Sequence, residues 1–208
     1  KCGPVEDQSF VNYEADIAKV NDLIFPVLDE NAAEKMNDYM LQAAGEGDSV
    51  GGILETVVIG VPAGVGEPWF DTMESMLAHA LFSVPAVKGV EFGEGFGFAD
   101  MKGSEANDSF EMKDGKVVTK TNHNGGINGG ITNGMPIRFQ TVVKPTPSIY
   151  KKQETVNMET MENEVMQIEG RHDPAIIHRA RVVVDSMTAI VLADMLALRY
   201  GTDWLQRR

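Results

Sequence analysis

The sequence predicts a single α+β domain over residues 1–208, and three observations lead to this fold class. Hydrophobic residues make up 43% of the chain, which is enough to build a sizeable core in one domain. Segments with helical and strand periodicity follow one another as helix, strand, helix, several strands and a final helix. This order favours an α+β fold over a doubly wound parallel sheet.

The first predicted element is an amphipathic helix over residues 31–44, which Gly45 ends. Asn31 can cap its start, and Glu34 completes a capping box with it. The apolar stripe that should face the core consists of Ala33, Met36, Met40 and Ala43.

A strand and a second helix should follow. The run 53–61 is apolar and rich in β-branched residues, so its length and composition favour a strand. Pro68 suits the first turn of a helix, and Pro85 follows the expected end of that helix. We expect this helix to lie on a sheet through residues at helical spacing, namely Phe70, Met73, Leu77 and Ala80.

The middle of the chain predicts a hairpin and one further strand. Asp114 and Gly115 separate two short apolar runs, and this pair is typical of a two-residue turn that needs positive φ at both positions. Residues 137–143 alternate between apolar and polar side chains and should form a strand. Lys144 therefore lies at a strand end.

The last part of the chain predicts a loop, a short strand and a long helix. Residues 148–164 are polar and lack periodicity, which favours a surface loop before a strand over 165–168. Residues 182–200 are apolar nearly all round, which indicates a central, largely buried helix that Gly201 closes.

Composition excludes several classes of function. A formal charge of −13 opposes nucleic acid as a partner, although an anionic small molecule could still bind a local cluster of cations. That cluster would come from one C-terminal stretch: Arg138, Lys144, Lys151, Lys152, Arg171, Arg179 and Arg181.

The single cysteine, Cys2, excludes a disulfide framework and a multi-thiolate zinc site, and it favours a cytoplasmic protein. The sequence shows no run of apolar residues long enough for a membrane span. His172 and His178 lie six residues apart and complete no recognised ligand spacing, so we predict no metal site.

Residues 122–134 form a glycine-rich run that could hold a ligand. Its five glycines, from Gly125 to Gly134, would let backbone amides approach a ligand closely, or they could simply turn the chain beside a sheet. Simple nucleotide-binding templates fail, because Met135 and Pro136 follow the last glycine and no GxGxxG is present.

Two further clusters carry polar side chains that suit chemistry. Lys144, Thr146 and Ser148 alternate with prolines, so one cation and two hydroxyls would be held rigidly for a phosphate. In residues 171–174, Pro174 disfavours helix at Asp173, which makes this tetrapeptide an extended or turned approach to the last helix. A purely structural alternative has Asp173 capping that helix and Arg171 pairing with a nearby carboxylate.

Taken in order, these clusters and several shorter motifs resemble chorismate synthase. The similarity covers most of the chain, and the stretch from Arg171 to Pro174 with Arg179 and Ala180 carries its most specific motif. The other matching segments are residues 47–52, 60–64, 85–89, 103–108, 122–134, 144–148 and 185–187.

The resemblance implies a lyase of the shikimate pathway of aromatic amino acid biosynthesis. Such an enzyme eliminates phosphate from 5-enolpyruvylshikimate 3-phosphate to give chorismate and requires reduced FMN. It also implies a β-α-β sandwich with central helices between antiparallel sheets, incomplete in this fragment, and a cytoplasmic homotetramer. The source of flavin reduction, an NADPH-dependent activity of its own or an external reductant, stays open.

The resemblance also implies roles for individual residues. Asp173 would adjust protonation at flavin N5, and Arg171 would contact the flavin or the anionic groups of the substrate. We therefore expect Asp173 and Gly129 to share one cleft. The remaining cofactor-binding residues would be Glu105, Ala106, Lys144, Pro145, Thr146, Pro147 and Ser148.

The sequence departs from the family pattern in its N-terminal part. Family members carry two catalytic histidines and a Gly-Arg-x-Ser-Ala-Arg-Glu segment there, and neither His79 nor His123 matches those histidines. We therefore predict that these 208 residues alone do not turn over substrate. Two alternatives stay open: a flavin- or phosphate-binding fragment without catalysis, and a structural or assembly module.

Overall fold

The computed structural model describes residues 1–201 and confirms the predicted α+β class. The elements are the helices α1 (Tyr13–Asp22), α2 (Glu30–Gly45), α3 (Met73–Phe82), α4 (Gly103–Ala106) and α5 (Ile177–Tyr200), the 3₁₀ turns η1 (Trp69–Asp71) and η2 (Gly95–Asp100), and the strands β1 (Gly52–Val58), β2 (Val87–Phe92), β3 (Phe110–Lys113), β4 (Lys116–Thr119), β5 (Ile127–Asn128), β6 (Ile131–Thr132), β7 (Ile137–Val143), β8 (Gln153–Asn157) and β9 (Glu162–Met166).

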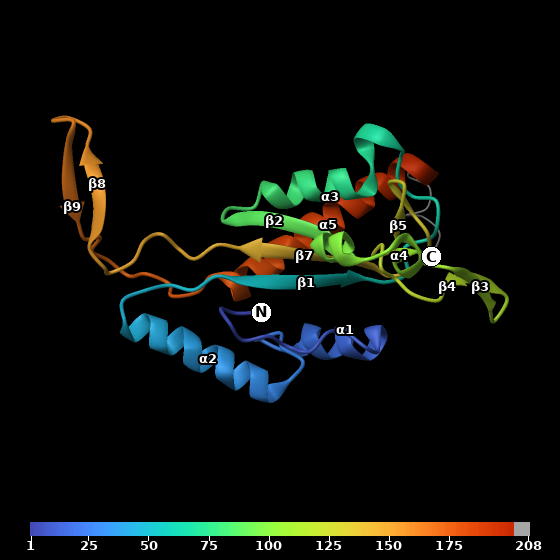
Figure 1. The fold of residues 1–208 in the computed structure, drawn as a ribbon, viewed down its shortest axis with the longest axis horizontal. Coiled ribbons are helices and arrows are strands. Elements are labelled where there is room, and N and C mark those ends of the chain that lie inside the picture. Colours follow the sequence, from blue (N-terminus) through green and yellow to red (C-terminus); the bar gives the residue numbers. More distant parts are fainter. Residues whose placement is uncertain (202–208) are drawn as a thin grey trace.

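The central sheet has the strand order β1-β7-β2, and β7 pairs antiparallel with both neighbours (Figure 1). β1 and β7 are paired along their whole length, from Gly52 opposite Val143 to Val58 opposite Ile137. The predicted strand 137–143 is therefore confirmed, while the predicted strand 53–61 ends three residues early. The chain turns away after Val58 because Gly60 has a φ of +82°, outside the extended region.

The main core lies between this sheet and the helices α3 and α5. Side chains along β7 alternate in burial, and Ile137 and Phe139 are fully buried on the helix-facing side. Leu77 of α3 and Val184 of α5 are also fully buried there. Burying such side chains stabilises the fold by about 1.5–3 kcal/mol each, which fixes the helices on the sheet.

The first two predicted helices begin at other residues than the sequence indicated. Helix α2 begins at Glu30, because the carboxylate of Asp29 accepts a hydrogen bond from the Asn31 amide at 2.8 Å and caps the helix. Helix α3 begins only at Met73, where the Thr72 hydroxyl caps it. Phe70 lies in the preceding 3₁₀ turn and is 86% exposed, so it does not extend the buried stripe.

The predicted loop over residues 148–164 is also wrong, because β8 and β9 form a two-stranded hairpin there. β9 ends at Met166, earlier than the predicted strand over 165–168. Nearly all side chains of the hairpin are exposed or half-buried, so neither face selects apolar residues. Without a buried face, no two-residue period marks the strands. The hairpin at Asp114 and Gly115 is confirmed, with φ values of +50° and +74°.

The last helix is longer and less buried than predicted. It begins at Ile177, five residues before the predicted start, and Gly201 ends it with a φ of +70°. One side is buried through Val184 and its neighbours along the helix, but Ile190 and Leu198 are 61% and 75% exposed. Within residues 1–201 the helix is covered by one sheet only, and no helix there is long and apolar enough to cross a membrane.

Candidate functional site

Three segments that are far apart in the sequence meet where β1 begins and β7 ends. They are residues 47–50, 144–150 and 170–175, and we call this region the Lys144 end. Backbone groups join all three segments, so the meeting is part of the fold. The connecting hydrogen bonds run from Ser49 Oγ to Thr146 O (2.6 Å), from Val50 N to Pro174 O (2.7 Å) and from Tyr150 N to Gly47 O (3.0 Å).

The segment 144–148 is held rigidly against Gly51. A Cβ atom at Gly51 would lie 2.9 Å from Cδ of Pro145 and 2.6 Å from the Val143 carbonyl oxygen, so only glycine allows this approach. The Thr146 hydroxyl is buried and has no hydrogen-bond partner. Leaving a buried hydroxyl unpaired costs about 1–3 kcal/mol, which suits a group that a ligand would satisfy.

Most cations of the predicted cluster are already paired with carboxylates. This corrects the expectation of one shared cationic pocket. Among the described residues, Lys144, Lys152 and Arg171 have no ion pair, and Lys144 and Arg171 belong to the Lys144 end. The paired cations are Arg138 with Glu94 (2.9 Å), Lys151 with Asp48 (2.6 Å), Arg179 with Asp173 (2.8 Å) and Arg181 with Asp185 (3.3 Å).

A shallow groove of about 450 Å³ crosses the Lys144 end. Its floor includes the backbone of Gly51 and Gly52, and its cations are Lys1, Lys88 and Lys144. Lys144 is anchored through its amide, which donates to the Ala86 carbonyl at 2.9 Å, while its side chain is exposed. The three lysines give the groove a positive charge that suits a phosphate, although Thr146 does not line it.

Asp173 precedes α5 in a non-helical segment, as the following proline predicts. Its carboxylate accepts two hydrogen bonds from the Arg179 guanidinium, at 2.8 and 3.3 Å. In the structural alternative, Asp173 would cap the last helix and Arg171 would pair with a nearby carboxylate. Instead, Asp173 pairs with Arg179. Both side chains are partly exposed, so the pair contributes little stability, but the two-point contact fixes the orientation of the carboxylate.

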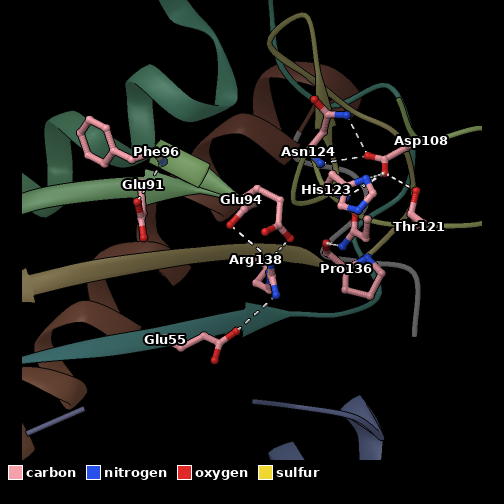
Figure 2. Close-up of polar contacts among 12 residues, drawn as sticks. Glu55, Glu91, Glu94, Phe96, Asp108, Thr121, His123, Asn124, Pro136 and Arg138 are labelled. Carbon is pink, nitrogen blue, oxygen red and sulfur yellow. Dashed lines mark hydrogen bonds and ion pairs between the residues drawn. The ribbon is translucent and has the colours of Figure 1, made fainter. Parts of the chain in front are cut away.

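The glycine-rich run lies at the opposite end of the sheet, beside α4 (Figure 1). We call α4 and residues 122–134 the Gly129 end. Asp108, only 5% exposed, anchors this run (Figure 2). Its carboxylate accepts hydrogen bonds from Thr121 Oγ1 (2.7 Å), His123 N (2.8 Å), Asn124 N (2.9 Å) and Asn124 Nδ2 (2.8 Å).

The hydrogen bonds to Asp108 favour the ionised form of its carboxyl. Burial alone would raise the pKa of its carboxyl, but the hydrogen bonds from Asn124, Thr121 and His123 outweigh burial, and the net shift of the pKa is downward. The His123 ring nitrogen Nδ1 lies 3.4 Å from Asp108 Oδ1 in a geometry that makes no hydrogen bond. It is therefore a buried polar atom without a partner, as is Asn122 Oδ1.

Gly129 and Gly130 form the turn between β5 and β6 and differ in what surrounds them. Both have positive φ, +59° and +89°. A Cβ at Gly130 would lie 2.6 Å from the Glu67 carbonyl oxygen, so packing requires glycine there. A Cβ at Gly129 would meet nothing within 4 Å. Packing therefore does not require glycine at position 129, whereas its positive φ favours one.

The other two predicted flavin contacts, Glu105 and Ala106, lie on α4. Glu105 is exposed, and its carboxylate accepts a hydrogen bond from the Lys102 amide at 3.0 Å, which closes this short helix. Nearby on β7, Arg138 contacts Glu94 and, more distantly at 3.9 Å, Glu55 (Figure 2). Burial raises the pKa of Glu55, and the positive charge of Arg138 only partly opposes that shift.

The structure therefore brings the predicted site residues together in two groups. Lys144 to Ser148, Arg171 and Asp173 lie at one end of β7, and Glu105, Ala106 and Gly129 lie at the other (Figure 1). A strand of seven residues is about 23 Å long. The expectation that Asp173 and Gly129 share a cleft is wrong for a single chain.

Sequence reasoning missed the part that Asp108 and Arg179 play. Asp108 was noticed only as part of a matching segment, because nothing in its spacing shows that Thr121 and Asn124 fold back onto it. Arg179 is six residues from Asp173, and the irregular approach to α5 hides their contact. Within residues 1–201, no group of three or more residues forms a metal-binding cluster.

Comparisons with known proteins agree with these motifs. The family model described as chorismate synthase matches residues 5–197. A chorismate synthase of Thermococcus gammatolerans is 53% identical over 179 residues, which cover 86% of this chain and 50% of that relative. One from Pyrococcus abyssi is 53% identical over 171 residues, covering 82% and 48%. The chain thus spans about half the length of the curated relatives it matches.

A solved structure agrees as well. A crystal structure of chorismate synthase superposes with a TM-score of 0.78 at 30% identity. The match covers 98% of this chain and 56% of that one. The chain therefore shares its overall fold with that structure.

Proposed function

Because this chain belongs to the chorismate synthase family, we propose that it forms the carboxy-terminal part of an enzyme that converts 5-enolpyruvylshikimate 3-phosphate to chorismate with reduced FMN. The reaction is a lyase reaction that removes phosphate and a ring hydrogen. The observation that carries the proposal is the Lys144 end, where Lys144 and Arg171 have no ion pair among residues 1–201 and the buried hydroxyl of Thr146 has no partner.

The residues of the Lys144 end suit the phosphate of FMN. Lys144 supplies a positive charge, and Thr146 and Ser148 supply hydroxyl donors on a segment that prolines and Gly51 keep rigid. Pre-organised donors lose little conformational entropy on binding, so they hold an anion well. The orphan hydroxyl of Thr146 is the group that such a ligand would satisfy.

Asp173 and Arg171 are the proposed catalytic residues. When bound, reduced flavin supplies transient electron density and takes up the departing hydrogen. The Asp173 carboxylate is oriented by the Arg179 guanidinium and would hold the proton at flavin N5. Arg171 is exposed and has no ion pair among the described residues, so its guanidinium is free for an anionic group of the flavin or substrate.

The Gly129 end supplies backbone contacts. Gly129 faces open space, and α4 presents Glu105 and Ala106 beside it. Since the two ends of β7 are about 23 Å apart, we propose that one flavin uses the Lys144 end of one chain and the Gly129 end of a second copy. This arrangement requires an oligomer, and the family resemblance implies a cytoplasmic homotetramer.

A second candidate function is flavin or phosphate binding without catalysis. The length of the chain favours it for the 208 residues alone, because they span about half of each relative. The two catalytic histidines of the family have no counterpart here, so protons cannot be delivered at those positions. Binding and turnover should therefore separate in this fragment.

The two functions are distinguished by comparing the 208-residue chain with the full-length protein. Titration with FMN, followed by quenching of flavin fluorescence, measures binding. Anaerobic incubation with reduced FMN and 5-enolpyruvylshikimate 3-phosphate, followed by chorismate absorbance, measures turnover. We expect chorismate from the full-length protein only. An inactive full-length protein would refute the proposed function. Chorismate formation by the 208-residue chain would refute the prediction that this chain binds flavin without turnover.

A further inference from the structure

The β8–β9 hairpin projects away from the central sheet at the Lys144 end (Figure 1). Two irregular segments, residues 144–152 and 167–173, connect the hairpin to the rest of the fold. The second segment carries Arg171 and Asp173, the two proposed catalytic residues. The contacts that hold this segment therefore decide where the two side chains lie.

The backbone of residues 170–173 has few restraints of its own. Within residues 1–201 no backbone–backbone hydrogen bond involves these four residues. One hydrogen bond reaches their backbone there, and it runs from Tyr150 Oη to the Gly170 carbonyl at 2.5 Å. Gly170 has a φ of +128°, which glycine can leave easily for other conformations. The bond from Tyr150 therefore helps to select the turn that directs the chain into Arg171.

Tyr150 contacts this segment on both sides of Arg171. Its hydroxyl bonds to Gly170, and its ring meets the ring of His172 edge-on, with centroids 4.7 Å apart and planes at 70°. The Arg171 side chain is exposed and has no ion pair among the described residues. The position of its guanidinium therefore depends on the backbone that Tyr150 holds.

Tyr150 is itself anchored to the Lys144 end. Its amide donates to the Gly47 carbonyl at 3.0 Å, and its carbonyl accepts a hydrogen bond from Gln167 Nε2 at 2.6 Å. A Cβ at Gly47 would lie only 3.1 Å from Cβ of Tyr150, so the two chain segments are in close contact. The tyrosine thus links the segment that carries Arg171 to residues 47–50.

We propose that Tyr150 is a positioning residue for the reaction, a step that rests on the proposed function. It holds Arg171 where the guanidinium meets an anionic group of the flavin or the substrate, and it acts on the reaction only through Arg171. Asp173 is held separately, by Arg179 and by the hydrogen bond from Val50 N to the carbonyl of the following proline. Loss of the tyrosine hydroxyl should therefore displace Arg171 more than Asp173.

Tyr150→Phe in the full-length protein tests the restraint without any ligand, because it removes the hydroxyl and keeps the ring contact. Trypsin cleaves after arginine, so the initial rate of cleavage after Arg171, followed by mass spectrometry, reports how often this segment opens. We expect the rate to rise by about 2–10-fold, the factor that corresponds to one net hydrogen bond.

Tyr39→Phe is the matched control, because the ring of Tyr39 packs on Gly3 and has no part in this segment. Its cleavage rate after Arg171 should equal that of the wild type. An unchanged rate in Tyr150→Phe, including the absence of cleavage in both proteins, overturns the proposal.

Turnover distinguishes a positioning residue from a residue that only stabilises the fold. We expect Tyr150→Phe to lower kcat/KM for chorismate formation by about tenfold, since a small displacement of a binding group is costly. In an Arg171→Lys background the same change should cost less than about threefold, because the flexible lysine depends less on the exact position of its backbone. An equal loss in both backgrounds would show that Tyr150 does not act through Arg171 and would overturn the proposal.

The two measurements keep this proposal separate from the proposed function. Faster cleavage in Tyr150→Phe, with no chorismate from the wild-type protein, refutes the proposed function and leaves the restraint on Arg171 standing. Chorismate from the wild-type protein, with unchanged cleavage in Tyr150→Phe, refutes the role of Tyr150 and leaves the proposed function standing.

Discussion

The two ends of the central sheet are built in different ways from similarly polar sequences. At the Gly129 end, two buried side chains are fully bonded: Asp108 accepts four hydrogen bonds, and Thr132 accepts from Val65 N and donates to Pro62 O. Two other buried atoms there, Asn122 Oδ1 and His123 Nδ1, have no partner. At the Lys144 end, Thr146 keeps a buried hydroxyl without a partner, and Lys144 and Arg171 have no ion pair among the described residues.

This difference suggests a division of labour. The Gly129 end uses its side chains to fix the backbone, which then offers amides and open space at Gly129. The Lys144 end fixes its backbone through proline and Gly51, and its Lys144 and Arg171 have no ion pair among residues 1–201. Substitutions at the first end should therefore affect stability, and substitutions at the second should affect activity.

The largest expected effect is at Asp173. Asp173→Asn keeps the shape and the position beside Arg179 but removes the proton acceptor, so kcat of the full-length enzyme should fall by about 10²–10³-fold. Stability should change little, because the ion pair with Arg179 is partly exposed. Steady-state chorismate formation and urea unfolding measure the two quantities. Asp194 is an exposed aspartate further along α5, and Asp194→Asn is the matched control. An equal loss of kcat in both variants would contradict the catalytic role proposed for Asp173.

At the other end, Asp108→Ala should lower the free energy of unfolding by about 3 kcal/mol, because it leaves buried donors of the glycine-rich run without an acceptor. Urea unfolding monitored by circular dichroism checks this value. If instead the protein kept its stability but lost activity, Asp108 would belong to the chemistry, and the division between the two ends would fail.

Adjacent glycines give a sharper test of the Gly129 end. Gly130→Ala should destabilise the protein by about 2 kcal/mol, since its Cβ would clash with the Glu67 carbonyl. Gly129→Asn should stay within about 0.5 kcal/mol of the wild type, because asparagine tolerates positive φ and the space is open. Only Gly129→Asn should weaken FMN binding without unfolding, as measured by fluorescence titration. Equal FMN affinity in Gly129→Asn and wild type would remove Gly129 from the site.

The smallest expected effect is on the pH dependence of stability. The pKa of Asp108 is lowered from 3.8, so its stabilising contribution is present above pH 3.8 and is lost as the pH falls through its folded-state pKa. Burial raises the pKa of Asp185 in α5. Its contribution to the free energy of unfolding is therefore present below pH 3.8 and is lost as the pH rises through its folded-state pKa. Urea unfolding between pH 3 and 7 should show a flatter acid loss for Asp108→Asn and a steeper one for Asp185→Asn; the opposite order would contradict both assignments.

Two kinds of element could be predicted from the sequence: strands with one buried face, and turns that require positive φ. The strand Ile137–Val143 follows from its alternating pattern, and the hairpin at Asp114 and Gly115 from its need for positive φ. β8 and β9 could not be predicted in this way, because a hairpin exposed on both faces leaves no apolar period.

The candidate site was predictable in its residues and not in its arrangement. The motifs around Lys144 and Asp173 identified residues that do meet, through hydrogen bonds that involve residues 47–50. The position of Gly129 at the far end depends on the direction in which β7 crosses the sheet, and a motif contains no such information. Local chemistry can be read from the sequence, whereas long-range placement requires the fold.

The central claim, that one flavin site uses both ends from two copies, is tested most directly by mixing two defective full-length proteins. Asp173→Asn damages the Lys144 end, and Gly129→Asn damages the Gly129 end. If the site is shared, co-expressed hybrids contain one intact site per mixed pair, and chorismate formation recovers well above either parent at limiting FMN. If each chain builds its own site, the hybrids show only the average of the two parents, and the claim is contradicted.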